Sequence, residues 1–281
     1  MLTAYHVSEK LASYVAFLYT IKWEKTNYKV RIEEKALPSG TCFMVFQYKG
    51  RFKGKFESSI DGEEIKPQQF YTIGQQTDTY TMYSANEVIE LTGAAFTPTG
   101  LYHLFGLNMT ELVNNPVDTQ TILDDSFDAF KQSYLSTELP RDRINYVENL
   151  LLNQLNMAKP KLTIIDEAVE LIQQTKGCSL IKDITNKLNV SERYFQKKFK
   201  QMVGISPSIY SRIVRFNCLF AEMSSEGEQN YKTLSALFNY YDFAHFSKDF
   251  KRYCGMSPSK FHVERFKFLK EAWIDNRPFA Y

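Results

Sequence analysis

The sequence has few of the residues that hold metals or form redox centres. Its 281 residues include four histidines and four cysteines. The cysteines are Cys42, Cys178, Cys218 and Cys254. No two of them have the close spacing of a zinc or redox motif, and the first half of the chain has only His6 and His103, far apart. We therefore expect no metal site, and we expect the cysteines to be small apolar side chains in a reducing compartment.

Long apolar runs and the common catalytic motifs are absent as well. The longest apolar run near the start, residues 12–18, is far too short to span a bilayer, and Glu9 and Lys10 precede it. No GxSxG, P-loop or GxGxxG pattern occurs in the sequence. These absences predict a cytoplasmic protein without a membrane segment, without a cofactor and without enzymatic activity.

The charges that are present divide the chain into two unlike parts. Residues 1–158 have 14 Lys and Arg against 19 Asp and Glu, whereas residues 159–281 have 20 against 13. The net charge is therefore −5 in the first part and +7 in the second. Such an asymmetry indicates a basic module for a polyanion, joined to an acidic module with another task.

The acidic part is expected to be rich in strands and then to become helical. Short β-rich runs at residues 28–32, 42–48, 69–73 and 89–96 are separated by turn signals. Residues 7–19 predict a short helix, although their apolar pattern is dense. Further helices are expected at residues 101–107, 127–134 and 142–156.

The last of these predicted helices has an apolar stripe, formed by Ile144, Val147, Leu151 and Leu155. The stripe has two interpretations. It packs on its own domain, or it pairs with the same helix of a second chain in a homodimer.

A linker at residues 158–161, which contains Pro160, predicts the domain boundary. We expect a regulatory domain at residues 1–158 and a helical domain at residues 159–281. In the helical domain, Thr163 and Asp166 fit a capping box, and Gly177 is a typical helix end. Ser179 and Ser191 are expected to cap the next two helices.

The helical domain contains an internal repeat. Ile184 and Asn189 recur at an offset of 50 as Leu234 and Asn239. After one added residue in the turn, the offset becomes 51. The pairs that share this offset are Phe195 and Phe246, Lys197 and Lys248, Phe199 and Phe250, Lys200 and Lys251, Gly204 and Gly255, and Ser206-Pro207 and Ser257-Pro258. Each copy predicts two helices joined by a tight turn, then a glycine stop and a Ser-Pro restart.

The second helix of each copy has a polar or basic face opposite its apolar one. In the first copy Tyr194, Phe195, Phe199 and Met202 are expected to face inward. The residues expected to face outward, toward DNA, are Arg193, Gln196, Lys197 and Lys200 in the first copy and Phe243, Ala244, His245, Lys248 and Lys251 in the second. Arg and Lys can donate to guanine, Gln can pair with adenine, and lysines can also contact phosphates. The other interpretation is a basic helical face that only keeps the domain soluble.

These residues resemble a known family. Residues 163–268, and above all LSALFNYYDFAHFSKDFK at 234–251 followed by GMSPSKF at 255–261, are similar to the DNA-binding domain of AraC/XylS-type transcription regulators. The resemblance implies two helix-turn-helix units joined by a long helix, here residues 207–223, with one recognition helix in each of two successive major grooves. Asn189 and Asn239 stand where the family usually has glycine, and asparagine tolerates the left-handed conformation needed there.

The resemblance places base-reading positions at Arg193, Gln196 and Lys197 in the first unit. In the second unit they fall on Phe243, Ala244 and Lys248, a less polar set.

The first domain resembles a sensor-type domain of uncharacterised function, so the expected fold class is α+β: a β-rich, cupin-like domain with helices, then an all-α domain. Double-stranded DNA is the expected partner, with RNA polymerase if the protein is an activator. A small-molecule effector would occupy an aromatic pocket, but the sequence does not say which aromatic residues would line it. The candidates are Phe43, Phe46, Tyr48, Tyr71, Phe96 and Tyr102.

Two other functions remain open. One is a small-molecule-binding or enzymatic protein whose helical part contacts proteins, and the other is a regulator without a ligand.

Overall fold

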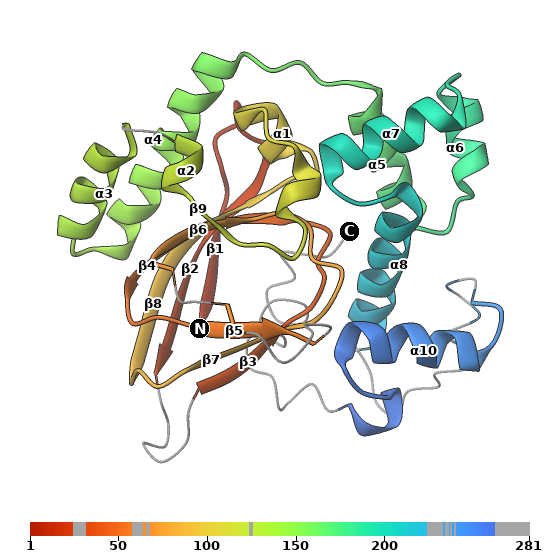
Figure 1. The fold of residues 1–281 in the computed structure, drawn as a ribbon, viewed down its shortest axis with the longest axis horizontal. Coiled ribbons are helices and arrows are strands. Elements are labelled where there is room, and N and C mark those ends of the chain that lie inside the picture. Colours follow the sequence, from red (N-terminus) through yellow and green to blue (C-terminus); the bar gives the residue numbers. More distant parts are fainter. Residues whose placement is uncertain are drawn as a thin grey trace.

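The computed structural model describes residues 1–24, 32–57, 64–65, 68–123, 126–223, 233, 236, 238 and 240–261. Strands dominate up to residue 96 and helices follow (Figure 1). This is the expected α+β order. The predictions for residues 28–31 and for Leu234 and Asn239 lie outside the described residues. No helix in the described part of the chain is long and apolar enough to cross a membrane.

The strands form two antiparallel sheets. The large sheet has the order β1 (Leu2–Tyr5), β2 (Val15–Glu24), β8 (Val88–Phe96), β4 (Cys42–Lys49), β6 (Phe70–Ile73) and β9 (Val117–Asp118). The small sheet has the order β3 (Ile32–Ala36), β7 (Tyr80–Ser84) and β5 (Lys53–Phe56). The strand predictions at 42–48, 69–73 and 89–96 are confirmed to within one residue at each end.

Both faces of the large sheet are buried, and they belong to two different cores. On β2, Phe17, Tyr19 and Trp23 belong to a core that also contains Met82 of the small sheet. Leu18 lies on the opposite face with side chains of the following helices. Successive side chains of a strand point to opposite faces, so a strand between two cores shows a dense apolar run and no alternation.

Helices after β8 cover the second face of the large sheet. They are α1 (Gly100–Phe105), the 3-10 helix η2 (Met109–Leu112), α2 (Gln120–Leu123), α3 (Ser126–Ser136) and α4 (Pro140–Ala158). The stripe on α4 packs inside its own chain, because Ile144, Val147 and Leu151 are buried in one core with sheet residues such as Phe46. These three side chains cannot form a dimer surface, and Leu155 is only partly buried against the same core.

The remaining described chain is helical. Its elements are α5 (Ile164–Gln174), α6 (Ile181–Lys187), α7 (Glu192–Val203), α8 (Pro207–Met223), α10 (Phe243–Cys254) and the 3-10 helix η3 (Pro258–Lys260). The predicted long helix at 207–223 has the expected bounds. Thr163 and Asp166 form the predicted capping box, and Ser191 caps α7. Asn189 has φ +53° in the turn, as predicted.

Three local predictions were wrong. Residues 7–19 form no helix: a turn is followed at Val15 by β2, whose dense apolar pattern comes from the two cores. Ser179 is not a cap, because α6 begins at Ile181 and its N-cap residue is Leu180, one position later. Tyr194 is 49% exposed, because the buried stripe of α7 follows Phe195 at helical spacing and leaves its neighbour outside.

Two glycines with positive φ differ in what an added Cβ atom would meet, so their replacement distinguishes the cost of backbone strain from the cost of a packing clash. Gly177 has φ +69°, and an added Cβ would lie 2.1 Å from the carbonyl oxygen of Ser211 on α8. Gly106 has φ +66° but open space around the Cβ position. Replacement of Gly106 by alanine should cost about 1–2 kcal/mol of unfolding free energy, from the left-handed backbone alone. Gly177→Ala should cost clearly more, because α5 and α8 must also separate. Urea unfolding measures both, and equal losses would contradict the close approach.

Candidate nucleic-acid interface

The first two-helix unit consists of α6, a tight turn and α7. The turn is closed by hydrogen bonds from the amide of Asn189 to the carbonyl of Asn186, 3.1 Å, and from the amide of Val190 to the carbonyl of Thr185, 3.1 Å. Ser191 then accepts a hydrogen bond from the amide of Tyr194 and starts α7. A positive φ suits glycine, and among the L-residues Asn and Asp tolerate it best. Asn189, with φ +53°, therefore suits this turn.

In the second unit, the described residues centre on α10. Asp242 is its N-cap and accepts a 2.7 Å hydrogen bond from the amide of His245. Phe246 and Phe250 are fully buried on one side of α10, with ring centroids 5.7 Å apart. Gly255 at φ +73° ends the helix. The cap, the aromatic pair and the glycine end match those of α7, so the second helix of each sequence repeat has the same local structure.

The outward face of both helices is exposed. This is true of all nine predicted DNA-contacting residues: Arg193, Gln196, Lys197 and Lys200 on α7, and Phe243, Ala244, His245, Lys248 and Lys251 on α10. Phe243 is 41% exposed, and its ring centroid lies 5.7 Å from that of the buried Phe246. Helices α7 and α10 therefore each have one face fixed by aromatic packing and one exposed face.

Helix α8 joins the two units. Near its start the ring of Tyr210 lies 5.7 Å from that of Phe199 on α7. Farther along, the ring of Phe216 lies 4.8 Å from Tyr253 and 5.8 Å from Phe250, both on α10. Figure 1 shows α7 and α10 near opposite ends of α8. One continuous helix thus sets the spacing between the two exposed faces.

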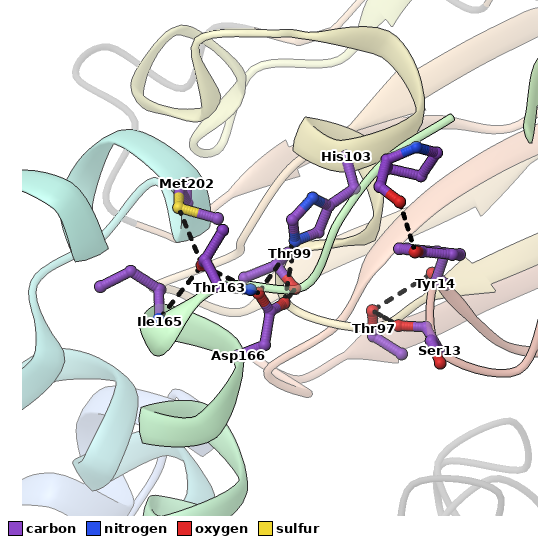
Figure 2. Close-up of polar contacts among 10 residues, drawn as sticks. Ser13, Tyr14, Thr97, Thr99, His103, Thr163, Ile165, Asp166 and Met202 are labelled. Carbon is purple, nitrogen blue, oxygen red and sulfur yellow. Dashed lines mark hydrogen bonds and ion pairs between the residues drawn. The ribbon is translucent and has the colours of Figure 1, made fainter. Parts of the chain in front are cut away.

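A polar cluster connects α1, in the first domain, to α5, in the helical part (Figure 2). One carboxylate oxygen of Asp166 accepts hydrogen bonds from the Thr99 hydroxyl at 2.6 Å and lies 2.9 Å from Nε2 of His103. The other accepts from the amide of Thr163 at 2.7 Å. The side chains of His103 and Asp166 are only 4% and 11% exposed. Asp166 therefore caps its own helix and holds that helix to the first domain.

The hydrogen-bond partners of Asp166 lower the pKa of its carboxyl by more than burial raises it. Burial alone would raise the pKa of the Asp166 carboxyl, but hydrogen bonds from His103, Thr99 and Thr163 hold the pKa below its usual value. The stabilisation that this carboxylate gives is therefore present above the ordinary pKa of about 3.9 and is lost as the pH falls through the lowered value.

Two more contacts join the first domain to the carboxyl-terminal ends of α7 and α10. At the end of α7, a Cβ on Gly204 would lie 2.7 Å from the carbonyl oxygen of Met109 in η2. At the end of α10, the buried Thr79 hydroxyl donates a 2.5 Å hydrogen bond to the carbonyl of Tyr253. One cluster of buried apolar side chains also contains both sheet residues and helical residues. The two parts of the chain thus form one packed body.

No local sequence pattern predicts these contacts. Asp166 fits a capping box, but Asp166 and His103 are 63 residues apart in the chain. Thr79 and Tyr253 are 174 residues apart. Only the folded chain brings such pairs together.

The contact between α8 and α10 gives a direct stability test. Phe216→Ala should lower the unfolding free energy by about 3–5 kcal/mol, because a fully buried ring is lost between two helices. Phe216→Leu, which keeps most of the apolar volume, should cost much less. Urea unfolding followed by circular dichroism measures both. A loss below about 1 kcal/mol for the alanine variant would show that this ring does not join the helices.

Comparison with known proteins gives two family matches. A helix-turn-helix domain family matches residues 184–263, and a domain of unknown function, DUF6597, matches residues 3–118. No curated protein matches the chain.

Solved structures with a similar fold are distant in sequence. An apo form of a ToxT variant from Vibrio cholerae is 10% identical with a TM-score of 0.47, and the alignment covers 90% of this chain and 96% of that one. A Vibrio cholerae ToxT structure with bound unsaturated fatty acid is 12% identical with a TM-score of 0.44, covering 90% and 94%. The AraC-like transcriptional activator CuxR is 12% identical with a TM-score of 0.31, covering 78% and 79%.

The matched segment contains α7, the joining helix α8 and α10, with the exposed faces described above. Residues 184–263 thus match a helix-turn-helix domain, which supports a DNA-binding transcription regulator.

Proposed function

We propose that the chain recognises a specific duplex sequence by placing α7 and α10 in two successive major grooves on one face of DNA. The observation that supports this proposal is the joining helix α8, which packs on α7 through Tyr210 and on α10 through Phe216. Its 17 residues span about 25 Å, and a recognition helix lies near each end. Successive major grooves on one face of DNA are about 34 Å apart. A helix of this length with one unit beside each end can place the two units in neighbouring grooves.

The two units are expected to read DNA differently. Arg193, Gln196 and Lys197 supply donors suited to guanine and adenine edges in the first groove. In the second, Phe243 and Ala244 suit thymine methyl groups, and Lys248 suits guanine or phosphate. Direct reading of bases is therefore expected to be stronger in the first groove.

We further propose that residues 1–158 control residues 159–281. The contacts of Asp166, Gly204 and Tyr253 with the first domain support this proposal, because they connect the first domain to α5, α7 and α10. A signal that moves the first domain would change the population able to bind DNA. RNA polymerase is a further partner if the protein activates. A homodimer would need a surface other than the buried stripe of α4.

Charge reversal on both recognition helices tests the DNA-binding surface. The double variant Lys197→Glu with Lys248→Glu should lose sequence-specific binding to a duplex selected from a random pool, because each change removes a cation from a major-groove face. For the single variants we expect weaker binding, and the slope of log affinity against log salt should fall by about one where the lysine contacts phosphate. Fluorescence anisotropy at two salt concentrations measures both effects.

The matched control reverses two exposed lysines of the first domain. Lys10→Glu with Lys53→Glu makes the same change in net charge on residues outside the helical part. This variant should keep affinity within about threefold of wild type at moderate salt, because distant charges are screened. Equal losses in both double variants would mean that net charge, and not these helices, governs DNA binding.

The polar cluster around Asp166 tests control through the first domain. His103→Leu removes a donor from a buried carboxylate and should lower the unfolding free energy by about 1–3 kcal/mol. His103→Gln keeps an amide donor and should cost less. If the first domain controls binding, His103→Leu should also change DNA affinity at least threefold. A stability loss with wild-type affinity would overturn control by this contact and leave the DNA-binding surface unaffected.

A further inference from the structure

The turn before α10 is one residue longer than the turn before α7. In the first unit, Val190 alone stands between the turn asparagine and the cap residue Ser191. In the second unit, Tyr240 and Tyr241 stand between the turn asparagine and the cap residue Asp242. The second unit therefore contains one tyrosine that has no counterpart in the first.

The two tyrosines of this turn have opposite environments. Tyr240 is buried, and its ring lies 5.5 Å from the rings of both His245 and Phe246. It takes the place that the partly buried Val190 has in the first unit. Tyr241 is 93% exposed, which is the largest exposed fraction of any large hydrophobic side chain in the described part of the chain. Tyr241 is therefore the added residue, and packing within the domain does not account for it.

The backbone of the turn places Tyr241 on the same side as Phe243. Asp242, which lies between them, is extended, with φ −153° and ψ 173°. Successive side chains of an extended segment point to opposite sides, so residues two apart share a side. The carboxylate of Asp242 accepts a 2.7 Å hydrogen bond from the amide of His245. The buried Tyr240 before it and the capped helix after it therefore restrain Tyr241 in its exposed position.

The exposed surface at the start of α10 is apolar, whereas the matching surface of α7 is charged. Phe243 and Ala244 are the first two residues of α10, and both are exposed. The residues at the matching positions of α7 are Glu192 and Arg193. An apolar ring exposed to water gains free energy when it contacts another apolar group. In the major groove, the 5-methyl group of thymine is the apolar group that base edges present.

We infer that Tyr241 is a specificity-determining residue, whose ring packs against a thymine methyl group in the second major groove. This assignment rests on the proposed function, because the N-terminal residues of a recognition helix are those that approach base edges. The ring makes the contact and the hydroxyl does not. A tyrosine hydroxyl on DNA commonly donates to phosphate, and the neighbouring carboxylate of Asp242 repels phosphate.

Deoxyuridine in place of thymine tests this contact, because the replacement removes only the methyl group. Each thymine of the selected duplex is replaced singly, and the affinity is measured by fluorescence anisotropy. At least one replacement should weaken wild-type binding by about threefold or more, because a buried methyl contact is lost. The same replacement should leave the affinity of Tyr241→Ala unchanged. This thymine should lie about 10 base pairs from the guanines that Lys197 contacts.

Two variants separate the ring from the hydroxyl and from the loss of any exposed tyrosine. Tyr241→Phe keeps the ring, so it should bind like the wild type and show the same sensitivity to deoxyuridine. Tyr146→Ala removes an exposed tyrosine from α4 and should change neither the affinity nor the sensitivity. In Tyr241→Ala, the slope of log affinity against log salt should stay as in the wild type, because no phosphate contact is lost. All three side chains are replaced at exposed positions, so the variants should fold.

Three results would overturn the role of Tyr241 while the wild type still binds its duplex specifically. They are a duplex without any deoxyuridine effect that depends on Tyr241, equal losses of affinity in Tyr241→Phe and Tyr241→Ala, and a reduced salt slope in Tyr241→Ala. The second and third would assign the residue to the phosphate backbone instead. If the wild type selects no duplex from the random pool, the proposed function fails, and the role of Tyr241 fails with it.

Discussion

The spacing of the exposed faces of α7 and α10 depends on one structural element, the helix α8, and on the aromatic contacts that it makes. Tyr210 meets Phe199 of α7, and Phe216 meets Phe250 and Tyr253 of α10. All five rings are buried almost completely. Close-packed interiors resist small shifts of neighbouring helices, so the orientation of α10 relative to α7 is restrained. The proposed recognition of two successive grooves depends on this fixed spacing.

The first domain holds this arrangement by polar contacts as well as by packing. Asp166 caps α5 and also accepts hydrogen bonds from Thr99 and His103. One carboxylate therefore both starts α5 and attaches this helix to the first domain. Thr79 performs a similar task at the end of α10. Buried polar contacts of this kind cost free energy when a partner is lost, so a movement of the first domain has a direct consequence for the helical part.

Local signals made the helical part predictable. Capping residues, a left-handed asparagine and a Ser-Pro start depend on near neighbours in the chain, so α7 and α8 were located to within a residue or two. The strands were harder to predict. In β2, Phe17, Leu18 and Tyr19 are all buried because the strand lies between two cores, and the alternation that marks a strand is lost. The pairing of His103 with Asp166 joins residues that are distant in the sequence, so no local signal predicts it.

A methylation-interference experiment on the selected duplex tests recognition of two successive grooves. Methylation of guanine N7 blocks contacts in the major groove, where this atom is exposed. We expect interference in two clusters about 10 base pairs apart on one face of the helix, and we expect the cluster that Lys197 contacts to disappear in the Lys197→Ala variant. A single cluster, or two clusters unaffected by changes in α7 and α10, would contradict the reading of two successive grooves.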